Sequence, residues 1–340
     1  MVYIIILNYN GWRDTIECLE SLLKIDNCNF KIIVIDNLST DDSLSKIISW
    51  SKDKFLIDSC TIESEFDLMY IKHDFSDKLS DSSLGAKSYS FYQSKQNGGY
   101  SAGNNNGIRH AMENSDAEYI WILNNDTIVD KNSLGEMLNV YALAEKRKLK
   151  LGIVGCKLLY YNNPNVIQCL GGVLYNPYIG IIRQVGNNEA DTGTIKYNIK
   201  PKVSYIPGTS MLVSVNFVKD VGLLSEEYFL YFEELDWTKR GEKRGWQIDY
   251  TLEAFVLHKE GGTINKDNYL NKSALSDYCF LRSKLLYTRK YENSFCKVTI
   301  FLGVILSFLL RIYKGQFDRI LTMARIVFNP NSRFFLPKID

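Results

Sequence analysis

Three acidic side chains occupy four consecutive positions of one strongly aromatic segment, where they could exchange protons with a substrate. Glu233, Glu234 and Asp236 follow the apolar run Tyr228–Phe232. A carboxyl group in such surroundings has a raised pKa, which suits a general base. Alternatively, these acids only stabilise the N-terminus of a helix, whose dipole favours negative charge there. On a helix, Glu233 and Asp236 would share one face and Glu234 would point elsewhere.

Polar clusters follow three short apolar runs that are typical of buried strands. The carboxyl ends of neighbouring parallel strands are where such sheets bind ligands, and nucleotides are common among them. A carboxylate at Asp36 can accept hydrogen bonds from ribose hydroxyls or a base N–H, or it can merely cap a turn. Asp126, together with a diphosphate, could hold a hard divalent cation. The three clusters are Asn8-Tyr9-Asn10, Asp36-Asn37 and Asn124-Asn125-Asp126.

A loop rich in glycine and asparagine precedes a helix expected over Asn104–Glu113. Glycines let the backbone approach a ligand closely, and N–H groups at a helix start can point toward anionic oxygens. The spacing does not match a dinucleotide fingerprint, and an ordinary loop explains the composition equally well. The residues singled out in this loop are Asn97, Gly98, Gly103 and Asn104.

The elements that must position these residues alternate between strand and helix in the first half of the chain. This alternation predicts an α/β fold with a mostly parallel central sheet flanked by helices. A polar tract, Ser76–Ser90, is expected to be a surface insertion. The expected strands are Val2–Leu7, Lys31–Ile35 and Tyr119–Leu123, and the expected helices are Trp12–Ile25 and one that begins at Asp41 or Asp42.

The composition of the 340-residue chain indicates a globular protein, because 46% of its residues are hydrophobic and 23% are charged. A net charge of +1 gives no overall field for nucleic acid, so no nucleic-acid partner is expected. The seven cysteines are odd in number and lack C-x-x-C spacing, which disfavours a disulfide framework or a zinc cluster. We therefore expect reduced thiols in a cytoplasmic protein without an N-terminal targeting signal.

The C-terminal part departs from this balance. Residues 279–340 contain 11 basic and 3 acidic residues, and Val298–Leu310 is an uncharged run flanked by Lys297 and Arg311. The run is shorter than the roughly 20 residues that a spanning helix needs. It is either a core helix or an interfacial segment that holds the protein on the inner face of an anionic plasma membrane.

Seven motifs, in this order, resemble family 2 glycosyltransferases of the bacterial, rhamnosyltransferase-like kind, from Tyr3 to about Tyr291. The resemblance implies a GT-A nucleotide-sugar domain over residues 1–265, with a donor-binding half to about residue 130 and an acceptor and catalytic half beyond it. A helical extension over residues 266–340 follows. The motifs are IIILNYNGW, VIDNLSTDDS, QNGGYSAGNNNGI, WILNNDT, PGTSMLVSVNFVKDVGLLSEEYFLYFEELDW, HKEGGT and YCFLRSKLLYTRKY.

The resemblance also implies roles for the residues. Glu234 becomes the general base beside Glu233, while Asp126 and His258 become ligands of Mg²⁺ or Mn²⁺. From its local sequence alone, a single histidine at a strand end such as His258 is more often a structural, hydrogen-bonded residue. Arg282 either adds positive charge at the diphosphate or lies on an ordinary helix. The remaining expected donor-binding residues are Asn8, Asn10, Asp36, Asn97, Gly98, Gly103, Asn104 and Asn125.

The expected activity is inverting transfer of a sugar from a nucleotide-diphosphate sugar to a hydroxyl of a glycan or lipid-linked glycan, in bacterial surface polysaccharide assembly. Two other classes remain open. A sugar-nucleotide nucleotidyltransferase usually carries a glycine-rich basic loop after its first strand, where this chain has residues 8–13, NYNGWR. A non-catalytic nucleotide-sugar or glycan-binding module would leave the acidic cluster at 233–236 unexplained.

Overall fold

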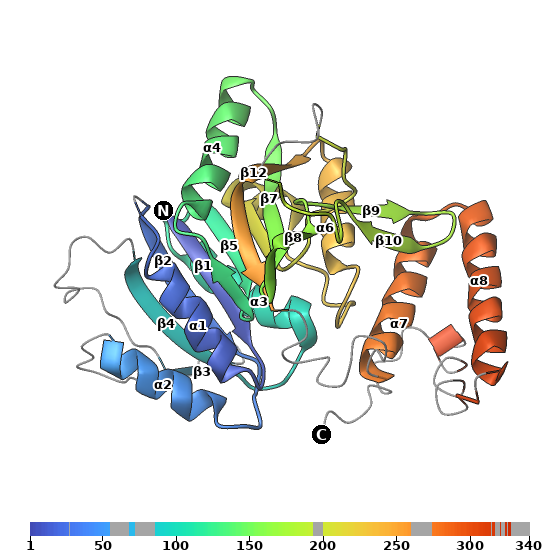
Figure 1. Cartoon of the computed structure of the whole chain (residues 1–340), viewed down its shortest axis with the longest axis horizontal. Helices are drawn as coiled ribbons and strands as arrows, with labels where there is room; N and C mark the ends of the chain where they lie inside the picture. Colours follow the sequence, from blue (N-terminus) through green and yellow to red (C-terminus); the bar gives the residue numbers. More distant parts are fainter. Residues whose placement is uncertain are drawn as a thin grey trace.

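The computed structural model describes residues 1–26, 28–54, 68–71, 86–192, 200–259 and 274–313, together with residues 315–316, 320, 324 and 326–327. It has a central sheet covered by helices, with the helices α7 (Ala274–Tyr291) and α8 (Ser294–Tyr313) side by side at one end (Figure 1).

The main sheet is mixed, and its strand order is β3-β4-β2-β1-β5-β11-β7-β12-β6, with β8 paired to β7. Neighbours from β4 through β2 and β1 to β5 run parallel, as the sequence predicted. Beyond β5 most pairs are antiparallel, so the expected mostly parallel sheet holds only for the part formed by β4, β2, β1 and β5. The strands are β1 (Val2–Asn8), β2 (Phe30–Asp36), β3 (Leu68–Ile71), β4 (Ala86–Ser94), β5 (Tyr119–Asn124), β6 (Thr127–Val129), β7 (Leu151–Tyr160), β8 (Asn163–Cys169), β11 (Ser210–Ser214) and β12 (Gln247–His258).

Both faces of this sheet are buried, which explains why β1 is an unbroken apolar run. Successive side chains of a strand point to opposite faces, so Ile4 and Ile6 enter one core cluster and Tyr3 and Ile5 the other. The helices α1, α2 and α4 contribute to the first cluster, and α3 and α5 to the second. The helices of this domain are α1 (Trp12–Leu22), α2 (Ser43–Lys54), α3 (Gly99–Glu113), α4 (Ser133–Lys146), α5 (Val215–Val221) and α6 (Glu233–Glu242), and β9 (Val173–Asn176) and β10 (Ile181–Gln184) form a separate hairpin.

Part of the polar tract expected as a surface insertion is an inner strand. Residues 72–85 lie outside the described residues, but Ala86–Ser94 form β4 between β2 and β3. The sequence of β4 alternates polar residues with aromatic ones, and Tyr89 and Phe91 are buried in the first core cluster. An alternating pattern of this kind fits a strand, although serine and aspartate dominate the residues before it.

Helix α3 lies close to β1 because small residues face the strand. A Cβ atom added at Gly107 would lie 2.6 Å from the Cγ2 atom of Ile5, which is fully buried. Gly103, expected to contact a donor, has the same packing role, since an added Cβ would lie 2.4 Å from the Cδ1 atom of Leu7. This close approach holds the N-terminus of α3 at the carboxyl end of β1.

We expect Gly107→Ala to lower the free energy of unfolding by about 1–3 kcal/mol, because overpacking a filled core costs that much. The matched control is Gly135→Ala in α4, where the nearest atom to an added Cβ is 3.7 Å away. That variant should be at least as stable as wild type, since alanine favours helix more than glycine does. Denaturant unfolding of both variants measures the difference, and equal stabilities would contradict the close packing of α3 on β1.

Candidate active site

A cavity of about 710 Å³ opens beside the carboxyl end of β5. Its wall is formed by the end of β5, the starts of α3 and α6, the hairpin β9–β10 and α7. Glu233 and Glu234 both line it, together with Tyr100, Asn124, Val173, Ile182, Arg183, Gln184, Asn187, Tyr205, Pro207, Gly208, Thr209, Leu230, Tyr231 and Phe280. The acidic pair and one of the three polar strand ends therefore share one cavity.

The two glutamates reach this cavity through an unusual start of α6. Tyr231 and Phe232, immediately before the helix, have φ angles of 69° and 71°, in the left-handed region that large residues rarely adopt. Aromatic packing holds the bend, because the Phe232 ring lies 5.6 Å from that of Phe280 and 5.7 Å from that of Tyr287. As a result Glu233 and Glu234 face the cavity together, whereas an ideal helix would have paired Glu233 with Asp236.

Glu234 is built to carry negative charge. Its Oε1 atom accepts a hydrogen bond from the backbone N–H of Gly208 at 2.9 Å. The carbonyl of Gly208 in turn accepts a hydrogen bond from the Tyr100 hydroxyl at 2.7 Å. A Cβ at Gly208 would lie 2.5 Å from that hydroxyl and 2.6 Å from Glu234 Oε1, so a glycine is needed here. Burial raises the pKa of Glu234, and the Gly208 N–H partly offsets the rise.

Glu233 differs from its neighbour in having less support for its charge. It is 2% exposed, and its Oε2 atom has no hydrogen-bond partner among the described residues. Burial, and then the charge of Glu234, raise the pKa of Glu233 well above its usual value. Two adjacent carboxyl groups avoid ionising together, and the Gly208 N–H favours the charge on Glu234 over that on Glu233.

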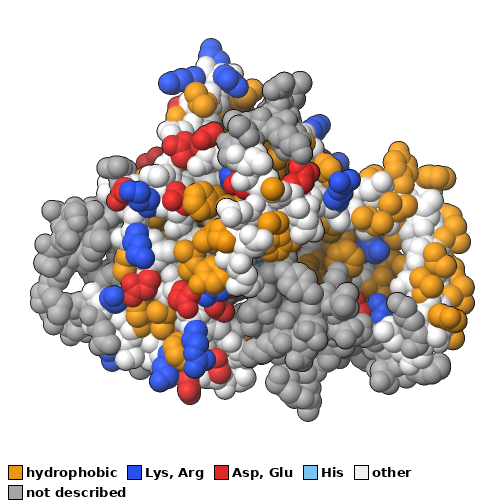
Figure 2. Space-filling model, in the orientation of Figure 1, with side chains coloured by type: hydrophobic (Ala, Val, Ile, Leu, Met, Phe, Trp, Pro, Cys, Tyr) orange, Lys and Arg blue, Asp and Glu red, His pale blue; other side chains and the backbone are white. Residues whose placement is uncertain are grey.

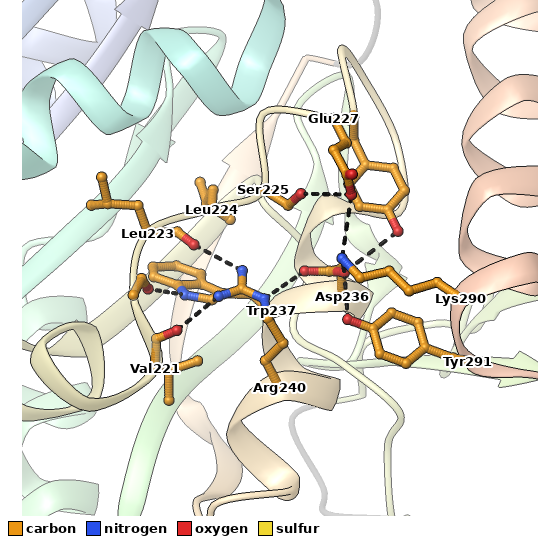
Figure 3. A network of polar contacts seen from close by, with 12 residues as sticks. Val221, Leu223, Leu224, Ser225, Glu227, Asp236, Trp237, Arg240, Lys290 and Tyr291 are labelled. Carbon is orange, nitrogen blue, oxygen red and sulfur yellow. Dashed lines mark hydrogen bonds and ion pairs between the residues drawn. The ribbon is translucent and has the colours of Figure 1, made fainter. Parts of the chain in front are cut away.

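Asp236 is the centre of a structural ion-pair network. Its carboxylate is fully buried and accepts hydrogen bonds from Arg240 at 2.7 Å, Lys290 at 2.9 Å and Tyr291 at 2.7 Å (Figure 3). Burial alone would raise the pKa of Asp236, but the Tyr291 hydrogen bond and the charge of Arg240 lower it below its usual value. Asp236 does not line the cavity, and its contacts indicate a structural role in place of the expected catalytic one.

Arg282 also supports the chain that leads into α6. It lies on α7, is 6% exposed, and its Nη1 atom donates a hydrogen bond to the carbonyl of Glu227 at 2.8 Å. A guanidinium buried against this segment is not presented to a diphosphate. The structure therefore favours a positioning role for Arg282 over the expected contact with the donor.

The polar residues at the ends of β1, β2 and β5 meet, as predicted, but several of them bind one another. Asp36 is fully buried and accepts hydrogen bonds from Asn8 at 2.7 Å and Gln93 at 3.1 Å, as well as from Ser39. Asn8 is also fully buried. Both side chains are already surrounded by protein donors and acceptors, which favours a framework role over the expected direct contact with a nucleoside.

Asn10 and Asn125 extend this framework to the neighbouring turns. The Asn10 side-chain oxygen accepts a hydrogen bond from the backbone N–H of Thr40 at 2.8 Å. The Asn125 side-chain amide donates to the Thr15 hydroxyl at 3.0 Å. These contacts fix the loops after β1, β2 and β5 against one another, which shapes the edge where a ligand would bind.

The glycine- and asparagine-rich loop is held in the same way. Asn97 Oδ1 accepts hydrogen bonds from the Asn37 side chain at 2.8 Å and the Gly99 N–H at 3.0 Å, and the Asn104 side chain donates to the Tyr100 carbonyl at 3.0 Å. Gly98 is the residue before α3, and a Cβ there would lie 2.5 Å from that of Ala102. The loop is thereby fixed beside the cavity that Tyr100 lines.

Asp126 and His258, 132 residues apart in the chain, lie side by side. Asp126 Oδ1 is 3.2 Å from His258 Nε2, and His258 Nδ1 is 2.9 Å from the side-chain oxygen of Gln168. A carboxylate and an imidazole oriented from behind form a donor set that suits Mn²⁺ or Mg²⁺. Within the described residues no group of three or more His, Cys, Asp and Glu side chains could hold a metal, so phosphate oxygens would have to complete its shell.

Sequence reasoning missed the residues that position Glu234. Tyr100 and Gly208 both lie inside quoted motifs, but nothing in either motif indicates that they contact each other. The Pro207-Gly208 pair is a turn signal that could have singled out Gly208 as a position of close approach. Arg183 of β10, the basic residue of the cavity wall within the described part, lies in no motif.

A curled mixed sheet of this order, with a polar edge at the ends of β1, β2 and β5 and an acidic cavity beyond it, is the GT-A glycosyltransferase fold. Comparison with known sequences agrees: residues 3–64 match the profile described as Glycosyl transferase family 2. The resemblance that the motifs predicted is therefore confirmed over residues 3–64.

Two curated relatives are similar over part of the chain. The low-salt glycan biosynthesis hexosyltransferase Agl10 of Haloferax volcanii is 24% identical over 50% of this chain and 52% of its own length. The N-acetylglucosaminyl-diphospho-decaprenol L-rhamnosyltransferase of Mycobacterium tuberculosis is 32% identical over 24% of this chain and 27% of its own. The chain thus matches about half the length of the first relative and less of the second.

Solved structures share the fold at low sequence identity. GalNAc-T7 with UDP, GalNAc and Mn²⁺ has a TM-score of 0.57 at 12% identity, covering 87% of this chain and 50% of that one. Staphylococcus aureus TarS 1-349 with UDP-GlcNAc has a TM-score of 0.53 at 14% identity, covering 97% and 81%. The Pyrobaculum calidifontis mannosyltransferase PcManGT with GDP-Man and Mn²⁺ has a TM-score of 0.50 at 12% identity, covering 96% and 84%.

We expect Asp236→Ala to lower the free energy of unfolding by about 1–3 kcal/mol, because it removes the fully buried carboxylate that accepts hydrogen bonds from Arg240, Lys290 and Tyr291. The matched control is Glu227→Ala, which removes the exposed partner of the same Lys290. Exposed ion pairs contribute at most about 1 kcal/mol, so the control should remain near wild type. Denaturant unfolding compares the two; a stable Asp236→Ala protein would contradict the structural role.

Proposed function

We propose that the protein is an inverting glycosyltransferase that moves a sugar from a nucleotide-diphosphate donor to an acceptor hydroxyl, with Glu234 as the general base. The observation that carries this proposal is the Glu234 carboxylate, oriented by the Gly208 N–H in a cavity next to the polar edge of a GT-A sheet. Donor complexes among the structural neighbours and the glycan-related names of both relatives support it.

The carboxylate at Glu234 accepts the proton of the acceptor hydroxyl as that oxygen attacks the anomeric carbon. A single displacement inverts the configuration and needs no covalent enzyme intermediate. Glu233, which retains its proton, can donate a hydrogen bond in the cavity and adds no second negative charge beside the base. Tyr100 and Gly208 keep Glu234 in place while the proton moves.

The donor is assigned to the first half of the domain, where the framework of Asn8, Asp36 and Asn125 fixes the loops around it. Asp126 and His258 would hold Mg²⁺ or Mn²⁺, and the bound cation would neutralise charge on the departing diphosphate. We retain residues 1–265 as the catalytic domain, with the donor half up to about residue 130. The acceptor assigned to the second half is a glycan or lipid-linked glycan, at the cytoplasmic face of a membrane.

We expect Glu234→Gln to lower kcat about 10²–10⁴-fold with little change in donor affinity, because glutamine keeps the size of the side chain but cannot accept the proton. The matched control is Glu242→Gln, an exposed carboxyl group at the other end of α6, which should behave as wild type. Sugar transfer and nucleotide binding, measured on the same preparations, separate the base from a structural acid.

The same assignment fixes the direction of the pH dependence. Because burial raises the pKa of Glu234, the base is protonated at acidic pH, and kcat/KM should rise with pH through a midpoint above the ordinary glutamate value of about 4.3. This acidic limb should vanish from the residual activity of Glu234→Gln. If it persists unchanged in that variant, another group titrates and Glu234 is not the base.

Divalent metal should bind together with the nucleotide. In wild type, Mn²⁺ with a nucleoside diphosphate should raise the melting temperature, whereas Asp126→Ala and His258→Ala should bind Mn²⁺ at least about tenfold more weakly, since even outer-sphere partners of a metal contribute that much. Asp249→Ala, an exposed carboxylate paired with Lys200, is the control. Full transfer activity in excess EDTA would remove the cation from the mechanism.

A further inference from the structure

The outer face of α8 is an exposed apolar surface. Within the described part of the chain, α8 is the one helix long and apolar enough to cross a membrane. Its most apolar 18 residues have a mean hydropathy of 2.1, and only 17% of them are buried. Hydrophobic side chains cover its outer side at the edge of the molecule (Figure 2). The exposed ones are Phe295, Val298, Phe301, Leu302, Ile305, Leu306, Leu309, Leu310, Ile312 and Tyr313. Of the two interpretations left open by the sequence, the structure excludes a fully buried core helix.

The tip of the hairpin β9–β10 extends this surface. Tyr178, Ile179 and Ile181 are each more than half exposed, and the Tyr178 ring lies 6.1 Å from that of Phe295 at the start of α8. The Thr299 hydroxyl donates a hydrogen bond to the Tyr178 carbonyl, which ties the hairpin to the helix. Helix and hairpin tip together form one surface, called here the apolar end face.

We propose that the apolar end face docks on an anionic lipid membrane. Charge decides between this partner and a second copy of the chain: α8 contains no acidic residue, and residues 279–340 contain 11 basic residues against 3 acidic ones. A second copy would bring the same excess of positive charge, whereas anionic headgroups attract basic residues such as Lys297 at the start of an interfacial helix.

The helix lies along the membrane surface in this arrangement. One side of α8 is used by the protein itself, because Cys296, Ile300 and Val304 are buried in a cluster with Tyr278 and Leu285 of α7. Helix α7 carries the exposed charges of Arg289 and Lys290 at its end, which cannot enter the hydrocarbon region. Partial insertion of the exposed side satisfies both constraints.

The apolar end face is continuous with the wall of the active-site cavity. Strand β10 exposes Ile181 at the end face and lines the cavity with Ile182, Arg183 and Gln184, and Phe280 of α7 lines it as well. A docked enzyme would thus hold its cavity next to the membrane surface. This deepens the proposed function, on which it rests, by specifying an acceptor whose sugar is carried on a membrane lipid.

The test is sedimentation of the full-length protein with vesicles of phosphatidylglycerol and phosphatidylcholine, or of phosphatidylcholine alone, at low salt. Wild type should pellet with the anionic vesicles and be released by high salt. Leu306→Glu and Leu309→Glu should each weaken binding about tenfold, because a leucine side chain leaves the interface. Ile179→Glu should weaken it too, since the hairpin tip shares the face. Leu143→Glu, an exposed leucine on α4, is the matched control.

Two outcomes would overturn the proposal. One is wild-type protein that stays in the supernatant at low salt; light scattering that shows a dimer broken by Leu306→Glu would then identify a second copy as the occupant. The other is Leu306→Glu and Leu309→Glu proteins that pellet like wild type. Donor hydrolysis without vesicles is measured in parallel: if it is normal in variants that do not pellet, any failure concerns docking and leaves the catalytic assignment intact.

Discussion

The removal of two adjacent carboxyl groups from water at the start of α6 is the constraint on which the rest of the site depends. Burying such a pair is unfavourable unless one member stays protonated and the other receives a hydrogen bond, and Glu233 and Glu234 divide these roles. The strained backbone at Tyr231 and Phe232 makes the arrangement possible, and it persists because the surroundings fix it from both sides. The Phe232 ring is clamped by aromatic neighbours on α7, and Asp236 anchors the first turn of α6 to Lys290 and Tyr291 of that helix.

The two halves of the domain are joined at the same place. Gly99, with a φ angle of 79°, comes so close to Phe229 that an added Cβ would lie 2.2 Å from its carbonyl oxygen, and the next residue, Tyr100, donates a backbone hydrogen bond to that carbonyl at 2.8 Å. The start of α3, which belongs to the donor half, therefore holds the segment that leads into α6. The Tyr100 hydroxyl then reaches Gly208, whose N–H orients Glu234, the proposed base. A short chain of contacts thus sets the distance between the start of α3 and Glu234.

The parts of this architecture that follow from local sequence could be predicted. Buried parallel strands are nearly continuous β-branched runs, so β1 and β2 were recognisable, and turn residues after them marked the ligand edge. What local sequence cannot distinguish is the partner of a buried acid. Glu234 and Asp236 are equivalent acids in the sequence. Only the fold brings the Gly208 N–H to Glu234 and the Lys290 ammonium to Asp236. Likewise, Asp36 is a residue type that often contacts ligands. Its carboxylate, however, already accepts hydrogen bonds from the side chains of Asn8 and Gln93, which lie on other strands. The pairing of Asp126 with His258 was accessible through family resemblance alone.

The ion pair between Lys290 and Asp236 has one more consequence. It connects α7, which packs beneath the apolar end face, to α6, which carries the proposed base Glu234, across 2.9 Å. If docking shifts α7, the position of α6 shifts with it, and the surface and the cavity become two sites of one thermodynamic cycle. Reciprocity then requires that whatever factor lipid contributes to substrate affinity, bound substrate returns to lipid affinity. If lipid raises the affinity for substrate, the loaded enzyme stays on the bilayer longer than the empty one.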